Sequence, residues 1–97
     1  MKAHYSRRAI AQIAEILATI AADNPRAAVA VGRRIETLAS LLARHPSVGR
    51  LTSLADVRVV PTKPYPYLIF YRSSDATGIT ILRVRHMARK EEWSMGR

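Results

Sequence analysis

Apolar residues in the first quarter of the chain recur every three or four positions, which is the period of an α-helix. The positions that share this face are Ile10, Ile13, Leu17 and Ile20. Ser6 precedes them and can cap the first turn by accepting a backbone hydrogen bond. The pattern therefore predicts an amphipathic helix over residues 6–22.

A second stretch of helical periodicity follows Asp23-Asn24-Pro25. Proline fits the first turn of a helix, where its missing N–H costs nothing, and Asn24 can cap it. Apolar residues then recur on one face: Ala28, Val31, Ile35, Leu38 and Leu42. His45-Pro46 ends this helix. So short a link between two helices forces them into an antiparallel hairpin.

Gly32 lies in the middle of the second predicted helix. Glycine inside a helix costs about 1 kcal/mol relative to alanine. We expect the first helix to approach closely at this position, which would explain the missing side chain.

Beyond Gly49 the apolar period shortens from about 3.6 residues to 2, as in a β-strand. Strands are predicted over residues 56–60, 67–72 and 79–86, and a turn over residues 73–78 joins the last two into an antiparallel hairpin. Residues 2–5 form a short stretch compatible with an edge strand. This order of elements predicts an α+β fold, in which an N-terminal helical hairpin packs on one face of a small antiparallel β-sheet.

The chain has 97 residues, which suit a single domain spanning residues 1–97. It contains no cysteine, so disulfides and thiolate metal sites are excluded. No histidine–carboxylate pattern and no glycine-rich phosphate loop is present, and we expect neither a metal nor a cofactor. No apolar run reaches the roughly 18 residues of a membrane span, and the start lacks the apolar core of a secretory signal. We therefore expect a cytoplasmic protein without a membrane partner.

Positive charge is the strongest compositional feature. Sixteen lysines and arginines against seven acidic residues give a net charge of +9, and arginine dominates the positive set. Such a domain suits nucleic acid, an acidic peptide or an acidic protein surface. Charge alone leaves all three classes of partner open.

Arg83 and Arg85 lie two residues apart in the last predicted strand, so their side chains share one face. Leu82, Val84 and His86 then point to the other face. We expect this strand to bring a positively charged rim to the sheet. The other basic residues that can join it are Arg58, Arg72, Arg89 and Lys90. The alternative for most of them is a solvated head group whose alkyl stem lies over apolar surface.

Five of the six aromatic residues fall in the second half of the chain, among the arginines. They are Tyr65, Tyr67, Phe70, Tyr71 and Trp93. This combination can stack on RNA bases, and it can equally form a core with a protein-binding groove. We expect Phe70 in the core and Trp93 as an exposed anchor. His86 ends the last strand, either as a group that moves a proton or, more simply, bonded to backbone.

In their order along the chain, these features resemble the ParE branch of the RelE/ParE toxin superfamily over residues 3–92. The resemblance rests on Asn24-Pro25, on Pro46 with Gly49-Arg50, and on residues 66–72 and 81–89. It implies a RelE/ParE-like fold and a toxin of a type II toxin–antitoxin system, held inactive by a cognate antitoxin. ParE-like members poison DNA gyrase, whereas RelE-like members cut mRNA on the ribosome.

The catalytic set of the RNA-cutting members is matched poorly. By alignment, Arg89 falls on a catalytic arginine and Arg58 near a catalytic lysine. Leu68 replaces the strand arginine, an apolar residue near Val60 replaces a second lysine, and the C-terminal tyrosine has no counterpart. The resemblance thus favours a non-enzymatic inhibitor of DNA gyrase.

Such an inhibitor is expected to bind its target or its antitoxin through Arg58, Arg83, Arg85, Arg89 and Trp93. The alternative is a RelE-like, ribosome-dependent endoribonuclease with Arg58, His86 and Arg89 as catalytic residues, helped by Arg83 and Arg85. A third alternative is a non-toxic member of the family that serves only as a co-repressor with its antitoxin.

The expected partner is a ParD-like antitoxin with an acidic C-terminal segment. A domain of charge +9 gains from an acidic ligand. The helical hairpin suits an amphipathic helix, and a sheet edge suits strand addition. We expect the segment to fold on binding and to place carboxylates against Arg83, Arg85 or Arg89. Charge reversal at Arg85 is then expected to slow association without abolishing the complex.

Overall fold

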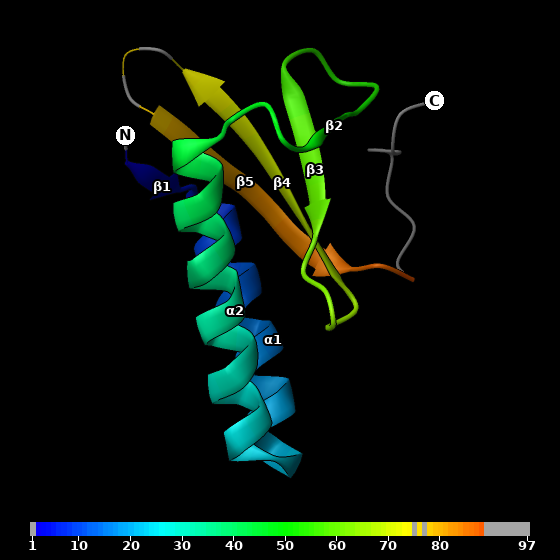
Figure 1. Cartoon of the computed structure of the whole chain (residues 1–97). Coiled ribbons are helices and arrows are strands. Elements are labelled where there is room, and N and C mark those ends of the chain that lie inside the picture. The colour runs from blue at the N-terminus through cyan, green and yellow to red at the C-terminus, as the bar shows by residue number, and fades with distance from the viewer. Residues whose placement is uncertain (1, 75, 77, 89–97) are drawn as a thin grey trace.

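A helical hairpin and a five-stranded sheet form the two layers of the molecule (Figure 1). The computed structural model describes residues 2–74, 76 and 78–88. In chain order the elements are β1 (Ala3–Tyr5), α1 (Arg7–Asp23), α2 (Pro25–Arg44), β2 (Arg50–Leu51), β3 (Val57–Pro61), β4 (Tyr67–Ser74) and β5 (Gly78–His86). The predicted α+β fold, with the helices before the main strands, is confirmed.

Both helices begin with the predicted caps. The Ser6 hydroxyl accepts a hydrogen bond from the Ala9 N–H at 3.0 Å. The Asn24 side chain accepts one from the Ala27 N–H at 3.1 Å, and Pro25 occupies the first turn of α2. Because Asn24 alone separates the helices, α1 and α2 run antiparallel and side by side (Figure 1).

Where β1 ends, Ser6 and the first turns of α1 take over the hydrogen bonds to β5. The Ser6 N–H donates to the Ile81 carbonyl at 2.9 Å, and the Ser6 hydroxyl donates to the Leu82 carbonyl at 2.9 Å. Nearly two turns later, the Gln12 side chain accepts a hydrogen bond from the Val84 N–H at 2.8 Å. These bonds fix α1 along β5, since they satisfy backbone groups that a longer β1 would have paired.

The sheet has the strand order β1-β5-β4-β3-β2. Strands β2 to β5 are antiparallel to their neighbours, as predicted, whereas β1 pairs with β5 in parallel. Residues 2–5 thus do provide an edge strand. The short β2 on the other edge was not predicted, because two residues carry no periodicity. Asp56 was predicted in a strand but has a positive φ of 63°, so it belongs to the turn before β3.

A β-bulge in β5 changes which way its side chains point. Phe70 pairs with Arg83 and the next residue of β4, Tyr71, pairs with Ile81, so Leu82 is the extra residue. Leu82 packs against the apolar cluster on the face of the sheet away from the helices. The prediction that Leu82 faces away from Arg83 and Arg85 is therefore wrong, because strict alternation does not hold across a bulge.

The main core lies between the helices and the sheet. Its buried members are Ala9, Val31, Ile35, Leu38, Ala39, Leu42, Ala43, Ile69, Tyr71, Ile79, Ile81 and Val84. A smaller cluster on the other face of the sheet consists of Val57, Val59, Leu68 and Phe70. The prediction of Phe70 in a core is confirmed, since its side chain is fully buried.

The prediction for Gly32 is wrong. A Cβ atom at this position would lie 3.5 Å from the nearest Leu17 methyl carbon, which is an ordinary van der Waals contact. Alanine would fit between the helices, so their packing does not require a glycine here.

Candidate functional site

The two arginines of β5 lie on the sheet face that the helices leave free. Arg83 pairs with Phe70 and Arg85 pairs with Leu68, both members of the smaller apolar cluster. The two arginines are only 9% and 6% exposed. The expected rim of positive charge on this strand is therefore largely covered, because both arginine side chains are buried.

Arg85 lies over an aromatic ring. Its guanidinium carbon is 5.3 Å from the centre of the Phe70 ring, and its Nη1 donates a hydrogen bond to the His86 carbonyl at 3.2 Å. A guanidinium in this position covers apolar surface with its planar face. Burial of this kind makes Arg85 part of the packing of the sheet.

Arg58 lies on the opposite face of the sheet, towards the helices, where it pairs with Tyr71. Its Nη1 donates to the Gly49 carbonyl at 2.7 Å and to the Ser47 carbonyl at 3.3 Å. The Tyr71 hydroxyl donates to the Pro46 carbonyl at 2.7 Å and accepts from the Gly49 N–H at 2.9 Å. Arg58 and Tyr71 together fasten the connection that follows α2 to the sheet.

The pKa of the Tyr71 phenol is raised at this position. Burial raises the pKa of its phenol, against the opposing effects of the Gly49 hydrogen bond and the positive charge of Arg58. The phenol is thus held protonated, which its hydrogen bond to the Pro46 carbonyl requires.

His86 is exposed at the end of β5, on the same face as Arg58. Its ring meets Tyr67 edge-on, with the ring centres 5.5 Å apart. Its Nδ1 accepts a hydrogen bond from the Ala88 N–H at 3.0 Å. In a neutral imidazole that accepts at Nδ1, the proton sits on Nε2. The lone pair of Nδ1 is thus directed to the backbone of Ala88.

The residues proposed for RNA cleavage do not converge. Arg58 and His86 flank β4 on its two sides, opposite Tyr71 and Tyr67. The two residues are four positions apart along the strands and two strand spacings apart across the sheet. Their Cα atoms are therefore about 16 Å apart. The sheet itself lies between these two residues and the side chains of Arg83 and Arg85. Arg89, Lys90 and Trp93 lie outside the described residues, and Arg72 is exposed.

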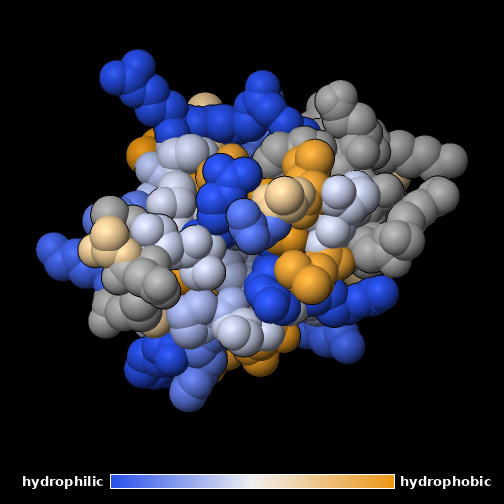
Figure 2. Space-filling model, turned by 90° about the horizontal axis from the view of Figure 1, so that it is seen from above, coloured by the Kyte–Doolittle hydropathy of each residue, from blue (hydrophilic) through white to orange (hydrophobic). Residues whose placement is uncertain are grey.

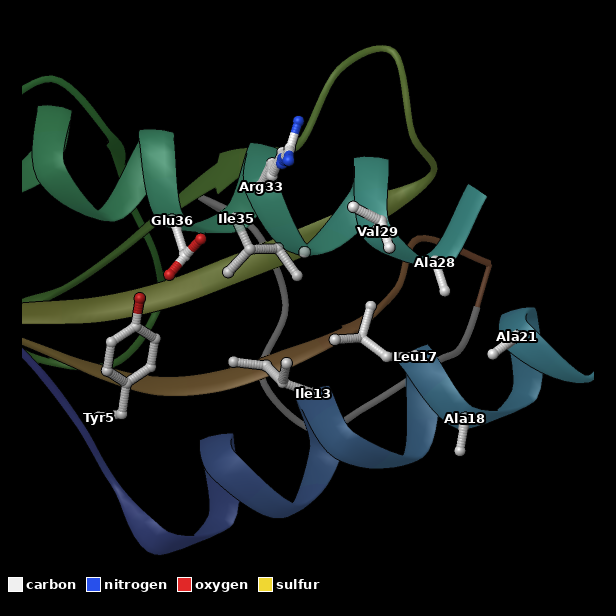
Figure 3. A pocket seen from close by; sticks show the side chains of 11 residues that line it. Tyr5, Ile13, Leu17, Ala18, Ala21, Ala28, Val29, Arg33, Ile35 and Glu36 are labelled. Carbon is white, nitrogen blue, oxygen red and sulfur yellow. The ribbon is translucent and has the colours of Figure 1, made fainter. Parts of the chain in front are cut away.

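An apolar groove runs between the two helices (Figure 3). Its open volume is about 780 Å³. The residues that line it are Tyr5, Ile13, Leu17, Ala18, Ala21, Ala28, Val29, Gly32, Arg33, Ile35 and Glu36. Val29 is 56% exposed in it. Sequence periodicity placed Ile13, Leu17 and Ile35 on the apolar faces of the two helices, and it missed that these residues border an open groove.

One end of this groove is polar. Figure 3 shows the Tyr5 hydroxyl pointing towards the Glu36 carboxylate. Burial and the negative charge of Glu36 together raise the pKa of Tyr5. Arg33 also lines the groove from α2, next to Gly32 in the chain. The groove thus offers an apolar floor with one cation and one anion at its rim.

A second apolar surface was also missed from the sequence. Three exposed large side chains lie in the connection between α2 and β3: Val48, Leu51 and Leu54. Figure 2 shows apolar side chains gathered among hydrophilic ones at this end of the molecule. A hollow of about 210 Å³ beside it is lined by Val48, Gly49, Arg50, Val59, Val60, Pro61, Lys63, Leu68 and Met87. The segment has no regular period, so the pattern did not reveal this surface.

Across the described part of the chain, no group of three or more His, Asp or Glu side chains could hold a metal ion. Neither described helix has the length and apolar character needed to cross a membrane.

Comparison with known proteins identifies the family. Residues 3–91 match the family described as the ParE toxin of the type II toxin–antitoxin system parDE. Toxin RelE2 of Caulobacter vibrioides is 38% identical over 84 residues, which cover 84% of this chain and 90% of that protein. A solved structure of the chromosomal ParDE system from P. aeruginosa has the same fold, with a TM-score of 0.76 at 21% identity over 89% of this chain and 95% of that one. The chain therefore belongs to the ParE toxin family of type II toxin–antitoxin systems.

Proposed function

We propose that this toxin acts in the cytoplasm by binding and inhibiting DNA gyrase, and that a ParD-like antitoxin keeps it inactive. The observation that supports a binding mode is the scatter of the candidate nuclease residues. Arg58 is bound to two loop carbonyls, His86 lies roughly 16 Å away, and the sheet separates both from Arg83 and Arg85. Catalysis of phosphodiester cleavage needs such groups around one phosphate.

The contact with gyrase is proposed to use residues that remain accessible. Arg83 and Arg85 are buried, so a direct role for them in this contact requires that the surface around them open. Arg89 and Trp93 remain the proposed contact residues of the C-terminal segment, and exposed Arg72 can add positive charge. Arg58 is proposed to act indirectly, by holding the connection that carries the exposed Val48.

The antitoxin is proposed to cover the groove between α1 and α2. Its apolar lining and rim charges suit one face of an amphipathic helix. The net charge of +9 favours an acidic segment, which would be disordered when free and would fold on this surface. Exposed ion pairs contribute only about 0–1 kcal/mol each. The apolar lining therefore carries most of the affinity, and the charges set the association rate.

A supercoiling assay tests the gyrase proposal. Purified toxin at concentrations near that of gyrase is expected to block supercoiling or to trap cut DNA, and addition of the antitoxin should restore activity. Toxin unfolded by heat is the control for nonspecific inhibition by a basic protein. Undisturbed supercoiling at a large excess of folded toxin would exclude gyrase as the target.

The second candidate function is mRNA cleavage on the ribosome, which the name of the relative Toxin RelE2 favours. Its catalytic residues would be Arg58, His86 and Arg89. Mapping of mRNA 5′ ends in a translating extract distinguishes this function from gyrase inhibition. New ends that disappear in His86→Ala, together with normal supercoiling, would support cleavage over the proposal above.

A further inference from the structure

The glycine in the middle of α2 is not explained by the fold of this chain. Gly32 is in a helix of 20 residues, where glycine is the least favourable residue after proline. A Cβ atom there would meet only Leu17, with methyl carbons at 3.5 and 4.0 Å. Neither distance requires a neighbour to move. Alanine would stabilise this helix without disturbing the contact between α1 and α2.

What distinguishes Gly32 is its place in the groove between the helices. It lines that groove together with Val29, Arg33 and Glu36 on α2 and with Leu17 on α1. Figure 3 shows Leu17 pointing from α1 towards α2. The absence of a side chain at residue 32 therefore leaves a recess beside Leu17, and exposes helix backbone to whatever enters the groove.

We propose that Gly32 is a specificity-determining residue, which receives a bulky apolar side chain of the antitoxin's amphipathic helix. The inference rests on the antitoxin arm of the proposed function. A glycine allows a partner to approach the backbone more closely than any other residue does. One large side chain seated there would fix the register of the bound helix, as an anchor in a groove does.

The dimensions and charge of the groove favour such an occupant. Its lining runs over residues 13–21 of α1 and 28–36 of α2, which is about 12 Å, or two turns of a bound helix. The rim of the groove carries Arg33 and Glu36, whose charges offset each other, so the net charge of +9 of the whole chain decides which partner is attracted. A second copy of the same basic chain would be repelled, whereas an acidic antitoxin segment would be attracted.

Two substitutions that fill the recess test this proposal. Gly32→Ala and Gly32→Leu both introduce better helix formers, so both chains should fold. We expect Gly32→Ala to raise Tm by about 4–8 °C, yet to weaken binding roughly tenfold, which corresponds to about 1.4 kcal/mol. Gly32→Leu should weaken binding by roughly a hundredfold or more. The probe is the full-length cognate antitoxin of the ParD type, whose binding is measured by titration calorimetry.

A higher Tm combined with weaker antitoxin binding would show that Gly32 serves the contact with the antitoxin and not the stability of the fold. Thr37→Ala is the matched control for helix propensity, because Thr37 is exposed on α2 and does not line the groove. Ala30→Leu is the control for added size, at another exposed position of α2 outside the groove. Both controls should bind the antitoxin as the unaltered chain does.

The outcomes separate this inference from the proposed function. If the unaltered chain does not bind the antitoxin, the antitoxin part of the proposed function is wrong, and the inference about Gly32 is overturned together with it. If the unaltered chain binds and Gly32→Leu binds equally well, the recess receives no side chain and the inference alone is overturned. If Gly32→Ala lowers Tm, the glycine is structural and the inference is likewise overturned.

Discussion

Tyr71 and Gly49, which are 22 residues apart in the chain, are in direct contact through the Tyr71 hydroxyl. The Gly49 N–H donates to the Tyr71 hydroxyl at 2.9 Å, and a Cβ atom at residue 49 would lie 2.6 Å from the same oxygen. A glycine is therefore required at this point, where the connection after α2 crosses the end of the buried phenol. The pair fixes the connection that carries the second apolar surface.

Removal of the Tyr71 hydroxyl should destabilise the fold. Tyr71→Phe leaves the Gly49 N–H and the Pro46 carbonyl without this partner, and unsatisfied buried groups cost about 1–3 kcal/mol each. We expect the free energy of unfolding to fall by about 2–3 kcal/mol in urea titrations. Tyr65→Phe, which alters a half-buried ring in the β3–β4 loop, is the control and should cost less than about 1 kcal/mol. Equal effects of the two substitutions would contradict the role given to Tyr71.

Arg58 should contribute to stability through the shape of its guanidinium group. Arg58→Lys keeps the positive charge and loses the geometry that reaches the Gly49 and Ser47 carbonyls. The expected loss in the free energy of unfolding is about 1–2 kcal/mol. Arg72→Lys, at an exposed position of β4, should change it by no more than about 0.5 kcal/mol. If Arg58→Lys leaves the free energy of unfolding unchanged, the structural role of Arg58 is contradicted, and a role in binding or catalysis becomes the better interpretation.

Stability should decline at alkaline pH. The pKa values of Tyr71 and Tyr5 are both raised in the folded chain. Above pH of about 10 the unfolded phenols ionise while the folded ones stay protonated, so the unfolded state binds fewer protons and the free energy of unfolding falls as pH rises. Urea titrations from about pH 8 to pH 11 measure this decline, which should be shallower in Tyr71→Phe. A stability that rises over this range would contradict the direction of both shifts.

A carboxylate placed in the groove between the helices should weaken the antitoxin complex. Val29 is 56% exposed in the groove, and Val48 is 59% exposed outside it. Val29→Asp should raise the Kd for the antitoxin at least tenfold, because it places charge against the apolar face of the bound helix. Val48→Asp is the matched control and should leave the Kd within about twofold. The reverse order of effects would place the antitoxin on the surface near Val48.

The contribution of charge to association should be tested at Arg33 and not at Arg85. Arg33 is exposed on the rim of the groove, so Arg33→Glu should slow association and reduce its dependence on salt. Arg85 is 6% exposed, and Arg85→Glu should instead lower stability by about 3 kcal/mol or more, since it buries a carboxylate over Phe70. Stopped-flow association at low and high salt measures the first effect. An unchanged rate for Arg33→Glu would exclude steering at this rim.

Much of the fold follows from local patterns in the sequence. The helical period, the Ser6 and Asn24 caps and Pro25 determined the hairpin, because a helix is built from contacts between residues three or four apart. The period of two determined the strands that follow, and their short turn determined an antiparallel pair. The features that mark the ParE family are spread along the same elements, so the family was also accessible from the sequence.

The candidate site depended on contacts between distant residues, which only the tertiary structure decided. The bulge at Leu82 and the register of β4 placed Arg83 and Arg85 on one face of the sheet and Arg58 on the other. Spacing along one strand could not reveal this, because the face of one strand relative to another is set by their pairing. The groove beside Gly32 likewise exists only once α1 and α2 lie together, since each helix alone presents an apolar stripe and no recess.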